Sequence, residues 1–217
     1  MMIAVLAIPT LGMAQNGTKA AIEIPDNLFV TLTFHDVRDD VARTGDRDVY
    51  AISTKNLARY FAWLQQEGWH PIRLKDVWQA RQKKKNLPPK SVLLTFDDGA
   101  LSSYSHVYPL LKQYNFPAVF AIPTSWINGN TKDAYEAYGE NNLMSWDQMR
   151  EMQQSGLTEF VSHSNNMHKG ILANPQKNMQ PAAITREYFP KLQKYESDQA
   201  YQKRLIADLK KSKEILD

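Results

Sequence analysis

The sequence has no cysteine, no long apolar run and no large excess of positive or negative charge. Without cysteine, a small fold held together by disulfides is excluded. No stretch of about 18 apolar residues occurs, so no segment is predicted to cross a membrane as a helix. The 26 Lys and Arg residues nearly balance the 23 Asp and Glu residues, which gives a net charge of +3. This weak and evenly spread charge argues against a nucleic-acid-binding protein.

Residues 1–14 differ from the rest of the chain. They carry no charge, are mostly apolar and end in the small-residue pattern Gly12-Met13-Ala14. This pattern predicts a secretory signal peptide cleaved after Ala14, with residues 15–217 as the domain that remains. The basic residues that usually precede such a run are absent before Lys19. The alternative is a buried N-terminal strand or helix.

The remaining sequence alternates between strand and helix patterns. Strands are predicted over 28–34, 70–74, 92–96, 118–122 and 160–162, and helices over 53–67, 75–81, 102–114, 145–154 and 198–216. This alternation indicates a parallel α/β architecture, either a barrel or a doubly wound sheet.

The last predicted helix ends the chain, and no strand follows it. We expect Tyr201, Leu205, Leu209 and Leu216 of this helix to face inward. Because a closed barrel of this type usually needs about 250 residues, we expect the domain to be cut short at its C-terminus.

Two adjacent carboxylates, Asp97 and Asp98, follow the strand predicted over 92–96. Active sites of α/β folds gather at the carboxyl ends of parallel strands. Successive residues of a strand point in opposite directions, so the two carboxylates are expected to have different neighbours and different roles. In the alternative interpretation, Asp98 or Ser102 caps the helix that follows.

Two of the five histidines, His163 and His168, follow the strand predicted over 160–162. Five residues of helix would set their rings about 140° apart. A strand would place them on opposite faces. A turn at Asn165-Asn166 would bring them together, and two histidines with a carboxylate form a common ligand set for a catalytic divalent metal. The alternative is two unrelated surface histidines.

These two motifs together resemble the polysaccharide deacetylases (NodB-like, carbohydrate esterase family 4). Residues 94–99, Leu-Thr-Phe-Asp-Asp-Gly, resemble the first motif of the family, and residues 163–168 resemble the second. The five-residue spacing of the histidines resembles the subgroup that acts on poly-β-1,6-N-acetyl-D-glucosamine. Residues 34–40 and 173–183 also resemble that subgroup.

The resemblance implies a distorted parallel (β/α) barrel of the NodB type, here incomplete at its C-terminus. Asp98, His163 and His168 would hold one divalent metal ion, either zinc, iron, cobalt or nickel. Asp97 would be the general base toward a water at the metal. His35, at a neighbouring strand end, would contact the substrate or tune the site; the alternative is a supporting or core histidine.

The resemblance also implies a substrate, a partner and a location. The substrate would be an N-acetylglucosamine exopolysaccharide of the biofilm matrix, and the partner would be the outer-membrane export machinery. The protein would be secreted across the inner membrane and act in the periplasm or at the outer membrane. Aromatic residues that could stack on sugar rings, or simply pack, are Trp126, Tyr135, Tyr138 and Trp146.

The sequence departs from the family at its C-terminal end. The family carries a late histidine that acts as general acid, and no histidine follows His168 here. Loss of a general acid typically costs about 10²–10⁴-fold in rate. Two alternatives therefore remain beside the leading prediction. One is a deacetylase of chitin or peptidoglycan, and the other is a truncated, non-catalytic sugar- or metal-binding remnant.

Overall fold

The computed structural model describes residues 27–42, 46 and 48–217. The predicted signal peptide, residues 1–14, lies outside these residues. None of the described helices is long and apolar enough to span a lipid bilayer.

Five parallel strands form the central sheet, which confirms the predicted α/β class. The central strand β3 (Ser91–Asp97) lies between β1 (Phe29–Phe34) and β4 (Ala118–Ile122), and β5 (Thr158–Ser162) pairs with β4. The short strand β2 (His70–Pro71) pairs with the beginning of β3. Within the described part of the chain the sheet is open and does not close into a barrel.

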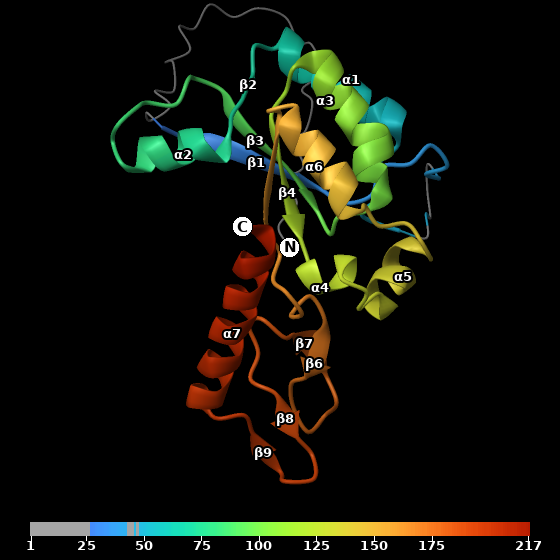
Figure 1. The fold of residues 1–217 in the computed structure, drawn as a ribbon, viewed down its shortest axis with the longest axis vertical. Helices are drawn as coiled ribbons and strands as arrows, with labels where there is room; N and C mark the ends of the chain where they lie inside the picture. The colour runs from blue at the N-terminus through green and yellow to red at the C-terminus, as the bar shows by residue number, and fades with distance from the viewer. Residues whose placement is uncertain (1–26, 43–45, 47) are drawn as a thin grey trace, which may run out of the picture.

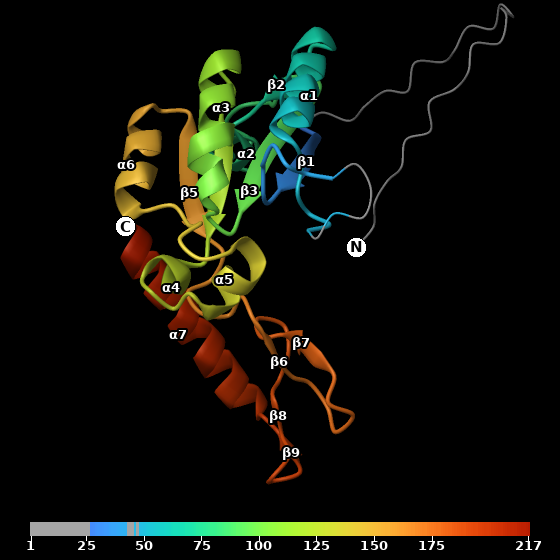
Figure 2. The same cartoon turned by 90° about the vertical axis from the view of Figure 1, so that its right-hand side faces the viewer.

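Helices cover both faces of this sheet. Figure 1 shows α1, α3 and α6 on one side of the strands and α2 on the other, with α4, α5 and α7 below the carboxyl ends of the strands. Figure 2 shows α1, α3 and α6 side by side. The helices are α1 (Thr54–Gln66), α2 (Leu74–Arg81), α3 (Tyr108–Tyr114), α4 (Thr124–Ile127), α5 (Lys132–Tyr138), α6 (Trp146–Gln154) and α7 (Asp198–Leu216).

A ladder of four phenylalanines runs across the sheet, with one ring from each of four neighbouring strands. Phe96 stacks on Phe34 and on Phe120, and the ring centroids are 5.2 Å apart in both pairs. The ring of Phe160 lies next to that of Phe120, with centroids 5.4 Å apart. These residues are direct partners in the strand register. The ladder therefore helps to set the register of the strands, and with it the relative positions of the strand ends that carry the predicted site residues.

The helix predicted over 102–114 is divided into two pieces. A π-helix, η1 (Ser103–Val107), leads directly into α3. Pro109 has no N–H to donate to the carbonyl of Ser105, and the N–H of Tyr108 instead reaches the carbonyl of Ser103. The hydrogen-bond register of the helix therefore changes directly before the proline.

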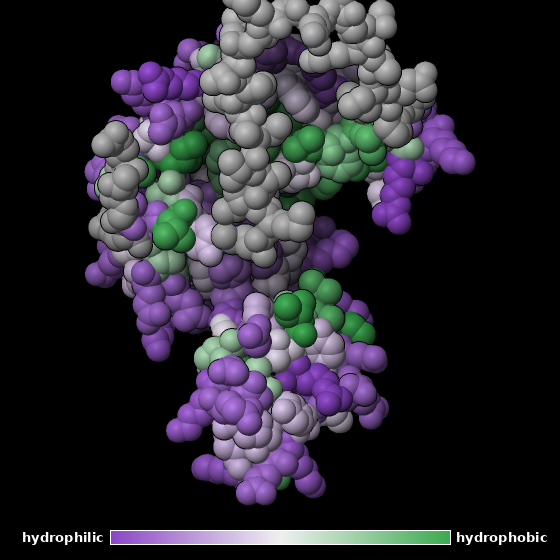
Figure 3. Space-filling model, turned by 180° about the vertical axis from the view of Figure 1, so that it is seen from behind, coloured by the Kyte–Doolittle hydropathy of each residue, from purple (hydrophilic) through white to green (hydrophobic). Residues whose placement is uncertain are grey.

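The C-terminal region differs from the sequence prediction in two respects. Helix α7 has the predicted bounds, but Leu209 is 47% exposed and Ser212 is fully buried in its place. Figure 3 shows hydrophobic surface on the part of the molecule that contains α7. Four short antiparallel strands were not predicted, because they are segments of two or three residues, none of them buried, that lie outside the strand–helix alternation of the sheet. They pair as β6 (Gly170–Leu172) with β7 (Met179–Pro181), and β8 (Tyr188–Phe189) with β9 (Lys194–Tyr195).

Candidate metal centre

All five predicted site residues gather at the carboxyl edge of the sheet. His35 directly follows β1, Asp97 ends β3 and Asp98 follows it, and His163 directly follows β5. His168 lies in the loop between β5 and β6. Because the strands are parallel, these segments leave the sheet on the same side.

Asp98, His163 and His168 form a compact cluster of possible metal ligands. The Oδ1 atom of Asp98 lies 3.5 Å from Nε2 of His163 and 3.2 Å from Nε2 of His168. One ligand atom from each residue lies within 4.8 Å of the other two. Tetrahedral coordination with bonds of about 2.1 Å places neighbouring ligand atoms about 3.4 Å apart, so the three residues fit a metal ion.

The environment of Asp98 supports the same interpretation. Its side chain is only 6% exposed, and its Oδ1 atom is buried without a hydrogen-bond partner. A buried carboxylate oxygen with no donor is costly unless a cation satisfies it. A divalent cation between Asp98 and the two histidines would remove this cost.

A left-handed turn directs Asp98 toward the histidines. Asp98 has φ +74° and Gly99 has φ +75°, and the N–H of Asp98 donates to the carbonyl of Ala121. A side chain at position 99 would also meet Ile122 at 3.2 Å. The positive φ therefore favours glycine here, and a larger residue would also force the Ile122 side chain to shift by a few tenths of an ångström.

The capping alternative for Asp98 and Ser102 is wrong. Ser102 makes no capping hydrogen bond to the helix that follows. Its hydroxyl donates to Oδ1 of Asp36 at 2.7 Å and accepts from the N–H of Val37 at 3.2 Å. The hydroxyl thus ties the segment after β3 to the segment after β1.

The two histidines are not unrelated surface residues. Their ring centroids lie 4.7 Å apart. The turn between them contains Ser164 with φ +78°. The predicted turn therefore brings the two rings together as expected.

Two aromatic residues support the cluster, and the sequence did not indicate these roles. The hydroxyl of Tyr138 donates to Oδ2 of Asp98 at 2.6 Å, and burial together with the Asp98 charge raises the pKa of Tyr138. Trp126 is 3% exposed and packs edge-on against His168 with centroids 4.8 Å apart. Tyr138 therefore orients the carboxylate, and Trp126 restricts the His168 ring.

Asp97 lies in the same electrostatic environment. Burial raises the pKa of Asp97, and the nearby His163 and His35 partly offset this effect. Burial also lowers the pKa of His163, against the opposing effect of Asp97. A carboxylate with a raised pKa is a stronger base than an exposed one, as proton abstraction from water requires.

A cavity of about 1130 Å³ opens over the cluster. His35 lines it, with its ring 5.2 Å from that of Tyr50. Asp98, His163 and His168 line it as well. The structure therefore places His35 at the cavity rather than in the core.

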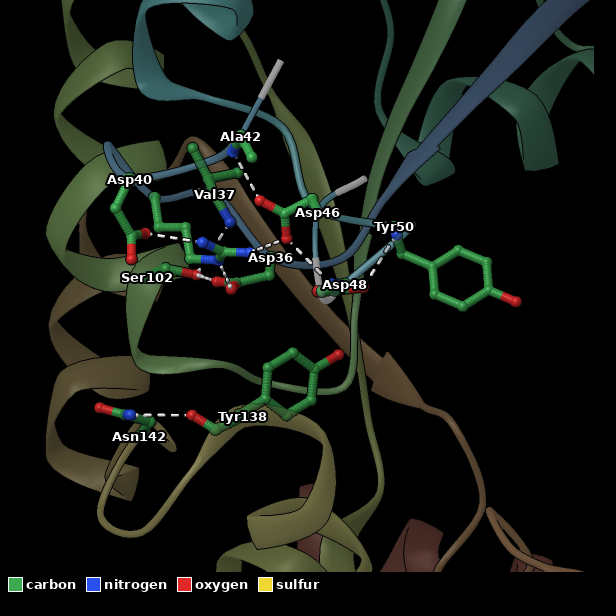
Figure 4. A network of polar contacts seen from close by, with 11 residues as sticks. Asp36, Val37, Asp40, Ala42, Asp46, Asp48, Tyr50, Ser102, Tyr138 and Asn142 are labelled. Atoms are coloured by element: carbon green, nitrogen blue, oxygen red, sulfur yellow. Dashed lines mark hydrogen bonds and ion pairs between the residues drawn. The ribbon is translucent and has the colours of Figure 1, made fainter. Parts of the chain in front are cut away.

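The segment that carries Tyr50 is held by a network centred on Arg38. Arg38 bonds to Asp36 at 3.1 Å, to Asp40 at 2.7 Å and to Asp46. Asp46 in turn accepts from the N–H of Asp48 at 2.9 Å, as Figure 4 shows. This network connects the segment after β1 with the Asp48 and Tyr50 side of the cavity.

Comparisons with known proteins agree with this geometry. A family model described as polysaccharide deacetylase matches residues 84–217. The chain belongs to the polysaccharide deacetylase family. It is 35% identical over 196 residues to the poly-β-1,6-N-acetyl-D-glucosamine N-deacetylase of Escherichia coli K12, an alignment that covers 88% of this chain. The chain spans only 29% of the length of that relative.

Two solved structures are similar in fold as well as in sequence. The de-N-acetylase of Aggregatibacter actinomycetemcomitans has a TM-score of 0.77 and 37% identity, covering 86% of this chain and 73% of that one. The BpsB deacetylase domain of Bordetella bronchiseptica has a TM-score of 0.75 and 41% identity, covering 89% of this chain and 76% of that one. The open parallel sheet of this chain is thus the sheet of a deacetylase domain.

Proposed function

We propose that this chain is a metal-dependent deacetylase that hydrolyses N-acetyl groups of poly-β-1,6-N-acetyl-D-glucosamine. The observation that carries the proposal is the cluster of Asp98, His163 and His168 on the floor of a large cavity. The relatives named above supply the substrate class, since the Escherichia coli protein is a deacetylase of that polymer.

In this proposal Asp98, His163 and His168 hold a divalent ion, with zinc, iron, cobalt and nickel as candidates. When bound, such an ion supplies Lewis acidity to the acetamido carbonyl and lowers the pKa of a water molecule toward about 7. Asp97 accepts a proton from the attacking water as its oxygen bonds to the carbonyl carbon. The carbon–nitrogen bond then breaks, which leaves acetate and a sugar amine.

The leaving amine needs a proton, and we propose that His35 supplies it. His35 lines the cavity but is not part of the cluster of candidate ligands. It is close enough to Asp97 for their charges to interact. This assignment offers a general acid in a chain that has no histidine after His168.

The direct test is acetate release from β-1,6-linked N-acetylglucosamine oligomers, with and without a chelator. Release that a chelator abolishes and added Zn²⁺ restores would support the proposal. Release that persists in chelator would contradict the metal dependence. Chitin oligomers and peptidoglycan fragments belong in the same assay, because activity on them alone would favour the alternative substrates. A folded chain that binds metal but releases no acetate from any of these substrates would be a non-catalytic metal-binding remnant.

We also propose that the protein is exported and works beside the machinery that carries the polymer to the outer membrane. The uncharged apolar run of residues 1–14 supports export. Cell fractionation with N-terminal sequencing of the product tests this proposal. A cytoplasmic product that begins at Met1 would contradict it.

A further inference from the structure

The loop that carries the two histidines is bound by a side chain from the distant helix α7. The carboxylate of Asp208 accepts the backbone N–H of Asn165 at 2.7 Å and that of Asn166, also at 2.7 Å, one on each oxygen. Both amides lie between His163 and His168. A single carboxylate therefore holds the middle of the segment whose two ends supply the candidate ligands.

The other side of the loop is held by α4. The N–H groups of Thr124 and Ser125 donate to the carbonyls of Ser164 and Asn165 at 3.1 and 3.0 Å. In this way α4 binds two backbone carbonyl groups of the loop, and Asp208 binds two of its backbone N–H groups. The loop has no regular secondary structure, so these contacts set its conformation.

Helix α7 is anchored by a second residue one turn further on. Ser212 is fully buried, and its hydroxyl lies 2.6 Å from that of Ser162, the last residue of β5. Residues four apart share a face of a helix, so Asp208 and Ser212 bind the same region from the same side. The end of β5 and the loop after it are therefore positioned together.

We infer that Asp208 is a positioning residue of the metal centre. By holding the amides of Asn165 and Asn166, it keeps the Nε2 atoms of the two histidines within metal-binding distance of Asp98. This inference rests on the proposed metal site. It gives α7, which lies below the carboxyl ends of the strands, a role in shaping the metal centre.

The test is the Zn²⁺ affinity of the metal-free chain, measured by competition with a chromophoric chelator. In Asp208→Asn one acceptor oxygen becomes an NH₂ group that opposes a backbone N–H. We expect Zn²⁺ affinity to fall roughly 10–100-fold, as for other groups that orient metal ligands. The visible spectrum of bound Co²⁺ should also change, because that spectrum reports ligand geometry. Glu214→Gln is the matched control, since Glu214 is an exposed carboxylate on the same helix and pairs only weakly with Lys211.

The outcomes separate this inference from the proposed function. If the wild-type chain binds no Zn²⁺, the metal centre itself is wrong, and the inference falls with it. If the wild type binds and Asp208→Asn binds equally well with the same Co²⁺ spectrum, only the inference is overturned.

A measurement on the wild type covers the case in which the variant does not fold. Hydrogen exchange of the Asn165 and Asn166 amides in the metal-free chain should be slow, because both are bonded. Exchange at the rate of a free loop would overturn the inference.

Discussion

The phenylalanine ladder predicts how much stability the central sheet loses when one of its rings is removed. Phe96 is fully buried and stacks between Phe34 and Phe120, with both centroid distances at 5.2 Å. Truncation to alanine leaves a cavity in the middle of the sheet. A buried Phe→Ala change costs about 3–5 kcal/mol, which in a chain of this size lowers the Tm by roughly 6–20 °C.

Position along the ladder predicts a graded effect. Phe160 is half-buried and has a ladder neighbour on one side only, so Phe160→Ala should cost less than Phe96→Ala. Phe29 lies on the same sheet but is 38% exposed, and Phe29→Ala should cost about 1 kcal/mol. Because Phe96 and Phe120 touch, a double-mutant cycle should give a coupling of about 0.5–1.5 kcal/mol.

The assay is denaturant unfolding of the metal-free chain, so that metal binding does not add to the measured stability. A cost of Phe96→Ala no greater than that of Phe29→Ala would refute the ladder as the central packing element. A coupling of zero between Phe96 and Phe120 would refute the argument that ring stacking sets the strand register.

Three further predictions concern the site and its surroundings. Asp97→Asn and His35→Asn should each lower acetate release about 10²–10⁴-fold while Zn²⁺ still binds; loss of Zn²⁺ binding would instead make the residue part of the metal site. Tyr138→Phe should weaken Zn²⁺ binding roughly 10–100-fold, and unchanged affinity would remove its orienting role. The hydrogen bond from the Arg204 guanidinium lowers the pKa of Glu196 in the folded chain below its unfolded value of about 4.5. The pair therefore stabilises the fold fully above the unfolded pKa of Glu196, and this stabilisation is lost as the pH falls through the folded pKa. The difference in unfolding free energy between wild type and Glu196→Gln should therefore shrink in acid, and a constant difference would contradict the ion-pair account.

The sequence predicted the sheet and the core of the site because both depend on local patterns. Strand β4 has the predicted bounds, and β3 extends the prediction by one residue at each end. Buried parallel strands are short continuous apolar runs, which can be recognised without tertiary information. That the two histidines and a carboxylate meet at one edge follows from the same patterns, since parallel strands end there. The choice of Asp98 rather than Asp97 as the third ligand is implied by the resemblance to the family.

The residues that support the site could not be predicted, because they contact the candidate ligands and their loop from distant parts of the sequence. Tyr138 reaches Asp98 across 40 residues, and Asp208 reaches Asn166 across 42. Neither lies in a motif, and nothing local distinguishes Tyr138 from Tyr135. On the inward face of α7 the prediction is wrong at Leu209, for a related reason. Leu209 lines the cavity, whereas a serine that bonds to β5 occupies the buried position.

The adjacent carboxylates show how a correct prediction can rest on an incomplete reason. Strand alternation predicts different neighbours for Asp97 and Asp98, and the two do differ. However, β3 ends at Asp97, and the left-handed backbone of Asp98 and Gly99 then turns the second carboxylate. Asp98 is thereby buried against Tyr138 and the histidines, and Asp97 remains half-buried beside them. Two identical side chains thus acquire separate environments because the strand ends between them, as the proposed roles of metal ligand and proton acceptor require.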